Sequence, residues 1–131
     1  VIEAVDTGNH DIEIWGDGEQ TRSFMYIDDC LSGMGRLMES SYTDPLNLGR
    51  AELVSINGLL DIIEGIAGIT LKRNYDLSKP QGVRGRNSDN ALIQSTLGWE
   101  PEVNLATGLE KTYRWIEEQY ERRKRGEIVV D

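Results

Sequence analysis

Apolar residues recur every three or four positions in several segments of the chain, and this spacing predicts amphipathic helices. The strongest pattern follows Asn104 and predicts a helix that ends near Arg123. Another helix should begin after Ser55. Both Asn104 and Ser55 are suitable N-caps, because their side chains can accept a hydrogen bond from a free first-turn amide.

Weaker patterns predict three further helical segments. One covers about residues 29–39, with a preceding Asp as its cap, and a lone Cys30 on its apolar side is expected to be a small core residue. Another carries residues 91–97, with Asn87 or Ser88 as cap, and ends at Gly98. Residues 1–8 have the pattern of a helix end.

Short alternating segments predict strands between these helices. Residues 12–29, IEIWGDGEQTRSFMYIDD, contain two alternating runs on either side of Gly-Asp-Gly, which predicts a β-hairpin or two strands that meet at a turn. Residues 46–49 and 71–77 are the other expected strands. The pattern therefore predicts a mixed α/β fold with short strands and about four helices, forming a single domain over residues 1–131.

Composition narrows the function classes. The 131 residues are 38% hydrophobic and 28% charged, as in folded globular proteins. A net charge of −9 argues against nucleic-acid binding, which depends on neutralising phosphates. No apolar run approaches the ~20 residues of a membrane span, and we expect no membrane partner. A single cysteine fits a cytoplasmic location. The single histidine, His10, lacks cysteine or histidine neighbours at metal-ligand spacing, so no metal site is expected.

Arg22 is a candidate anion-binding residue. It stands on an expected strand, where a β-branched or aromatic residue is more usual. A guanidinium held on a rigid strand can bind phosphate through two parallel hydrogen bonds. The alternative is a surface arginine paired with Asp17 or Glu19.

Two further candidates, Arg84 and Arg86, flank Gly85 in a loop that precedes a helix. A helix N-terminus beside two guanidiniums can bind an anion. The alternative is an exposed basic loop that pairs with Asp89 or with distant acidic residues. The basic residues at 122–125 are interpreted as a solvated helix end, and residues 127–131 are expected to fray or to pair with a neighbouring segment.

The strings WGDGEQTRSFMYIDD, PLNLG, VRGRNSDN and LGWEP occur in an order and spacing similar to the extended short-chain dehydrogenase/reductases that modify nucleotide sugars. QTRSF together with GVRGRNSDN most resembles the GDP-mannose 3,5-epimerase branch. The resemblance covers residues 12–120, which correspond to the C-terminal, substrate-binding part of such an enzyme. It implies an NAD-dependent epimerase or dehydratase whose N-terminal Rossmann domain is absent from this chain.

The resemblance also implies which residues bind the substrate, a nucleotide-diphosphate sugar with a GDP-sugar favoured. Arg22 and Arg84 correspond to the arginines that clamp the diphosphate. Arg84 is preferred to Arg86 because it stands five residues before Asp89, as in the common family pattern. The full expected set of substrate-binding residues is Trp15, Gln20, Arg22, Arg84 and Arg86.

The cofactor-binding and catalytic motifs of that family are not at matching positions in this sequence. No G-x-G-x-x-G follows a strand pattern, and the Tyr-x-x-x-Lys spacing of Tyr120 and Lys124 falls at the polar end of the last helix. We therefore assign no catalytic residue, and we expect the chain alone neither to bind NAD nor to turn over substrate. The alternative is a free-standing, non-catalytic domain that binds a nucleotide or a protein. Exposed strand edges are expected to favour self-association.

Overall fold

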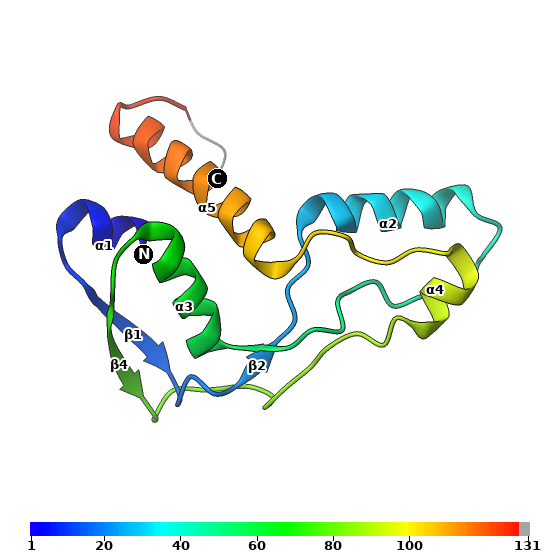
Figure 1. The fold of residues 1–131 in the computed structure, drawn as a ribbon, viewed down its shortest axis with the longest axis horizontal. Helices are drawn as coiled ribbons and strands as arrows, with labels where there is room; N and C mark the ends of the chain where they lie inside the picture. The colour runs from blue at the N-terminus through cyan, green and yellow to red at the C-terminus, as the bar shows by residue number, and fades with distance from the viewer. Residues whose placement is uncertain (129–131) are drawn as a thin grey trace.

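The computed structural model describes residues 1–128 and has the mixed α/β character that the sequence predicts. Its helices are α1 (Ile2–Thr7), α2 (Ile27–Glu39), α3 (Ile56–Ala67), α4 (Ala91–Leu97) and α5 (Leu105–Lys124). Its strands are β1 (Asp11–Trp15), β2 (Thr21–Arg22), β3 (Val54–Ser55) and β4 (Lys72–Asp76). Figure 1 shows α1, α3, β1 and β4 at one end of the molecule and α2 and α4 at the other, with β2 between them.

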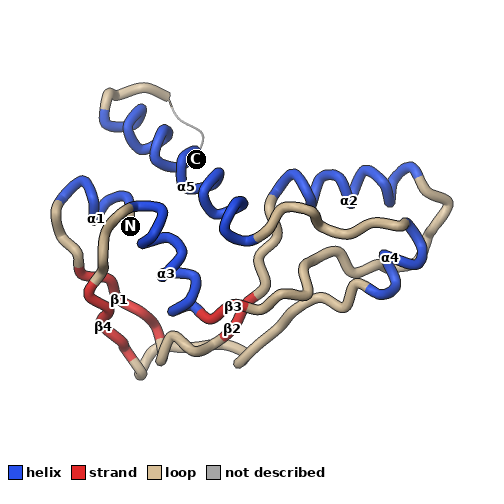
Figure 2. Tube along the Cα trace, in the orientation of Figure 1, coloured by secondary structure: helices blue, strands red, loops and turns tan. Residues whose placement is uncertain are grey.

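The two long-range strand pairs correct the hairpin interpretation. β1 pairs in parallel with β4, from Asp11 opposite Lys72 to Trp15 opposite Asp76, whereas β2 pairs antiparallel with β3. The runs on either side of the Gly-Asp-Gly turn therefore belong to different two-stranded sheets, as Figure 2 shows. The alternative of two strands that meet at a turn matches the structure. The strand expected at residues 46–49 is absent, because no described segment pairs with it.

Two of the expected helix caps are present. The Ser55 hydroxyl accepts a hydrogen bond from the Gly58 amide at 3.0 Å, and the Asn104 side chain accepts one from the Thr107 amide at 2.9 Å. Helix α4 ends at Gly98 in the left-handed region, as predicted. These ends depend on contacts within one turn of the chain, so the local sequence is sufficient to specify them.

The other expected caps are wrong. Helix α2 begins at Ile27 with no side-chain cap, and the Asp29 carboxylate faces the segment before α5 instead. Helix α4 is not capped by Asn87, which donates to the Ala51 carbonyl, nor by Ser88, whose buried hydroxyl has no hydrogen-bond partner. In each case a tertiary contact, or burial against another segment, takes the side chain away from the helix end.

The core of the described part is small. Its buried apolar side chains are Ile14, Leu60, Leu71, Ile93, Trp99 and Tyr113. An ionic cluster joins α3 to β4: Arg73 donates to Asp61 and to Glu64, whose second oxygen accepts the Leu71 amide at 3.0 Å. Cys30 is half-buried rather than a core residue.

Helix α2 exposes Ile27, Leu31, Met34 and Met38. Within residues 1–128, no helix is both long and apolar enough to cross a bilayer. Of the tail expected to fray or to pair, Glu127 forms ion pairs with Arg122 and Arg125, and residues 129–131 lie outside the described residues.

Candidate functional site

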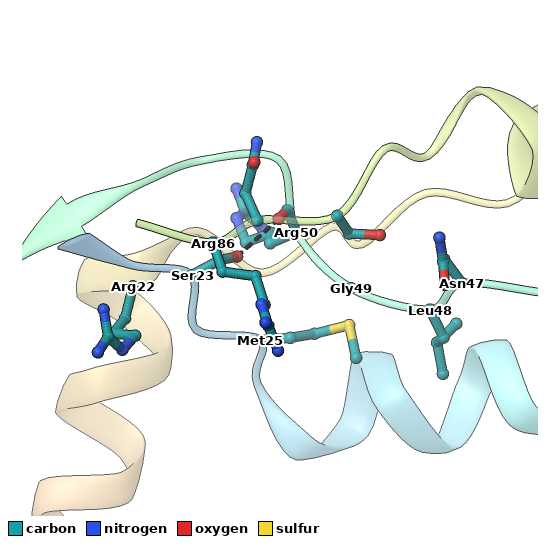
Figure 3. A pocket seen from close by; sticks show the side chains of 10 residues that line it. Arg22, Ser23, Met25, Asn47, Leu48, Gly49, Arg50 and Arg86 are labelled. Atoms are coloured by element: carbon teal, nitrogen blue, oxygen red, sulfur yellow. Dashed lines mark hydrogen bonds between the residues drawn. The ribbon is translucent and has the colours of Figure 1, made fainter. Parts of the chain in front are cut away.

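Three segments of the chain line an open hollow of about 580 Å³. This volume is within the usual range for small-molecule sites. The segments are the chain that leaves β2, the loop before β3, and the loop before α4, and Figure 3 shows side chains from all of them around the hollow. The lining residues are Arg22, Ser23, Met25, Asn47, Leu48, Gly49, Arg50, Arg86, Asn87 and Ser88.

Hydrogen bonds to backbone carbonyls hold these segments together. The Arg50 carbonyl accepts from the Ser23 hydroxyl at 2.6 Å and from the Ser88 amide at 3.2 Å. Asn90 donates to the Gly49 carbonyl at 2.9 Å. Residue 49 must be small here, because a Cβ would lie 2.7 Å from Ser88 Cβ. The hollow is therefore a built feature of the fold, fixed by contacts between residues far apart in the sequence.

Arg22 lines the hollow and also secures the loop before α4. Its Nη1 donates to the carbonyls of Thr21 at 2.7 Å and Val83 at 2.8 Å, and its Nη2 donates to the Gln81 carbonyl at 3.1 Å. It pairs with neither Asp17 nor Glu19, whose carboxylates accept from Arg84 and Asn57, so the surface-pair alternative for Arg22 is wrong. The N–H of Nε and one hydrogen of Nη2 remain unused and can bind an anion.

Arg84 does not line the hollow. Its Nη1 forms an ion pair with Asp17 at 2.8 Å, as the alternative of a distant acidic partner predicted. The hydrogen bonds from Arg84, followed by that from the Glu19 amide, lower the pKa of Asp17 below its ordinary value of 3.8. The Arg84 carbonyl accepts the Thr21 amide at 2.8 Å, so the backbone of residue 84 lies directly beside the strand that carries Arg22.

Arg86 and Arg50 complete the cationic rim of the hollow. Arg86 is exposed and makes no hydrogen bond or ion pair with any residue the structure describes, so its guanidinium is fully available. Arg50 was not among the sequence-based candidates. Its position immediately after the PLNLG string was the signal that could have identified it, because that string is one of those that carry the resemblance.

Gln20 and Trp15 lie outside the hollow. Gln20 is buried, and its amide donates to the Trp15 carbonyl at 2.9 Å across the turn that joins β1 to β2. Its side-chain oxygen is buried without a partner. Trp15 is half exposed, with its indole N–H on Glu13 at 2.7 Å and Lys79 over its ring. The expectation that either residue contacts a ligand stays a prediction.

The chemistry that this arrangement supports is anion binding. Three arginines and no acidic residue line one hollow on a chain whose net charge is −9, so the hollow is locally basic. Met25 and Leu48 add an apolar wall that a base or a sugar ring can contact. No group of three or more His, Cys, Asp or Glu side chains in residues 1–128 could hold a metal.

Comparisons with known proteins agree with this chemistry. Residues 1–112 match a family model described as GDP-mannose 4,6 dehydratase. The chain is 47% identical to GDP-mannose 3,5-epimerase 1 of Oryza sativa subsp. indica, over 90% of this chain and 31% of that protein. It is 45% identical to GDP-mannose 3,5-epimerase of Arabidopsis thaliana, over the same shares of the two chains. This chain therefore spans about a third of the length of these relatives.

A solved structure shares the fold. UDP-glucuronic acid 4-epimerase from Bacillus cereus, in complex with UDP-glucuronic acid and NAD, is 31% identical with a TM-score of 0.79, covering 89% of this chain and 38% of that one. The described residues contain no glycine-rich dinucleotide-binding turn. Neither parallel strand leads through a glycine-rich turn into a helix, since β1 continues to β2 and β4 to the loop before α4.

Proposed function

Because this chain belongs to the GDP-mannose 4,6-dehydratase family, we propose that it is the nucleotide-sugar-binding portion of an NAD-dependent epimerase or dehydratase. A GDP-sugar is the favoured ligand, since the curated relatives with the highest identity among those described are GDP-mannose 3,5-epimerases. In the intact enzyme, NAD would supply transient oxidation of the sugar. The role of this chain is to bind and orient the substrate, and the chain alone is not expected to turn over.

One observation carries this proposal: Arg22, Arg50 and Arg86 line the same hollow. A diphosphate has two negative groups, which suit guanidiniums that approach from separate segments. Binding energy from this remote part of the substrate positions the sugar for chemistry elsewhere. Removal of one such contact is expected to cost about 1.5–3 kcal/mol, the scale of a hydrogen bond to a charged group.

Arg84 lies outside the lining of the hollow but stays a candidate ligand contact. The resemblance makes it the second diphosphate clamp, whereas in this structure its guanidinium is paired with Asp17. The ion pair is solvent-exposed, with side-chain exposures of 65% and 42%, so exchange of Asp17 for a phosphate has a low cost. Arg84 can therefore act as a clamp only if it leaves Asp17 when the ligand binds.

Calorimetric titration with GDP-mannose tests the proposed function. Single variants Arg22→Ala, Arg84→Ala and Arg86→Ala remove the candidate contacts one at a time. Arg36→Ala is the matched control, because Arg36 is an exposed cation on α2 that makes no described contact and does not line the hollow. We expect each of the Arg22, Arg84 and Arg86 variants to bind roughly 10- to 150-fold more weakly and the control to bind like the original chain. Equal weakening in the control, or no binding to the original chain, would refute the proposal.

The second candidate function is a non-catalytic domain that binds a protein partner. It is supported by the apolar stripe on α2, where Ile27, Leu31, Met34 and Met38 are 49–83% exposed at helical spacing. Light scattering during size-exclusion chromatography distinguishes self-association from a monomer. A monomer that binds GDP-mannose favours the first function, whereas a chain that associates through α2 and ignores the nucleotide favours the second.

A further inference from the structure

Arg50 connects four segments of the chain at the hollow. Its carbonyl accepts hydrogen bonds from Ser23 and Ser88, as described above. Its guanidinium donates through Nη1 to the Val103 carbonyl, which belongs to the segment before α5. Only 18% of its side chain is exposed, so its position is closely defined by these contacts.

The guanidinium of Arg50 also has an exchangeable acidic partner. Its Nε lies 3.3 Å from a carboxylate oxygen of Glu52, whose side chain is 52% exposed. A long, half-solvated ion pair of this kind is weak. One hydrogen of Nη1 and both hydrogens of Nη2 remain unused, so Arg50 can bind an anion without giving up the Val103 carbonyl.

We propose that Arg50 is a further ligand-positioning residue of this site, which binds the diphosphate of the nucleotide sugar together with Arg22 and Arg86, and that Glu52 competes with the ligand for it. This inference rests on the proposed function, because it assigns a role within the same hollow. Glu52 lies outside the hollow and lowers the affinity for the ligand. Its carboxylate offsets the positive charge of Arg50, and it is displaced from Nε when the phosphate binds.

A purely structural role for Arg50 predicts a different result for Glu52. If Arg50 only holds the segments together, loss of the Glu52 contact loosens the hollow, and the ligand binds more weakly or unchanged. If Arg50 binds the ligand, Glu52→Gln removes a competing charge, and the ligand binds more tightly. The sign of the change therefore separates the two roles without any substitution of Arg50 itself.

The experiment is calorimetric titration of the 131-residue chain with GDP-mannose, and with inorganic pyrophosphate as a probe for the diphosphate alone. The variants are Arg50→Gln, Arg50→Lys, Glu52→Gln and the double variant, with Arg36→Gln as the control for loss of a distant cation. Circular dichroism and thermal unfolding of each variant check the fold. Arg50→Lys retains a cation that can donate to the Val103 carbonyl, so it keeps the test valid if Arg50→Gln fails to fold.

We expect Arg50→Gln to weaken both probes by about tenfold or more, as for a lost hydrogen bond to a charged group, and Arg50→Lys to weaken them less. We expect Glu52→Gln to strengthen binding severalfold, and this gain should shrink in the Arg50→Gln background because the effect acts through Arg50. Weaker or unchanged binding by Glu52→Gln, or an unchanged affinity of Arg50→Gln while Arg22→Ala still weakens binding, overturns this inference and leaves the proposed function standing. Absence of binding to the original chain overturns both.

Discussion

Asp29 provides a sharp test of how the hollow is held in place. It lies in the first turn of α2 and is only 8% exposed, yet its carboxylate contacts the segment before α5. Its Oδ1 accepts the Glu102 amide at 3.2 Å, and its Oδ2 accepts the Val103 amide at 2.9 Å. The Val103 carbonyl in turn accepts a hydrogen bond from Arg50, so Asp29 helps to hold the segment that positions the Arg50 guanidinium.

The change is Asp29→Asn, which keeps the shape of the side chain. Asparagine retains one acceptor oxygen and turns an NH₂ group toward the other amide, so one charge-assisted hydrogen bond is lost and two donors face each other. A hydrogen bond to a charged group contributes about 1.5–3 kcal/mol, and we expect a loss of about 2–3 kcal/mol in the free energy of unfolding. This is a large share of a typical total of about 5–15 kcal/mol.

The assay is urea unfolding followed by circular dichroism, with the slope of the transition checked for constancy. Asp28→Asn is the matched control, because Asp28 is the neighbouring exposed carboxylate and makes no described contact. Both variants remove one negative charge from the first turn of α2, so the macrodipole effect of about 0.3–1 kcal/mol is shared. A difference below about 0.5 kcal/mol, the scatter usual for surface substitutions, would refute the role given to Asp29.

Two other predictions concern the turn after β1 and the loop before α4. Arg84 lowers the pKa of Asp17, so this pair contributes stability above about pH 4 that is lost as the pH falls through the lowered pKa. We expect Arg84→Gln to raise the pKa of Asp17 toward 3.8 in an NMR titration, and an unchanged value would contradict the pairing. Gly8 and Gly16 both have positive φ, so an alanine is strained at either position. Only at Gly16 would the added Cβ also meet another segment, because it would lie 2.6 Å from Gln81 Cδ. Urea unfolding should therefore show a loss of about 1 kcal/mol for Gly8→Ala and a larger loss for Gly16→Ala. Equal losses would mean that Gln81 moves aside without cost.

The helices could be predicted from the sequence because the interactions that define them are local. The periodicity after Asn104 and Ser55, and the capping amides within three residues of each, are properties of one or two helical turns. Gly98 ends α4 for the same reason. The strand before the Gly-Asp-Gly turn, β1, was also predicted correctly. Its pairing partner was not, because β4 lies about 60 residues away in the chain.

The sequence by itself determined the mixed α/β class, the helix ends at Ser55, Gly98 and Asn104 and, through its motifs, the resemblance to enzymes that modify nucleotide sugars. Only the tertiary structure decided which arginines share a hollow, because side chains meet there through hydrogen bonds between segments far apart in the chain. It brought Arg50 and Arg86 to the same hollow as Arg22, and it paired Arg84 with Asp17. It also directed Asp29 away from its own helix, since a buried carboxylate is most stable where backbone amides converge on it.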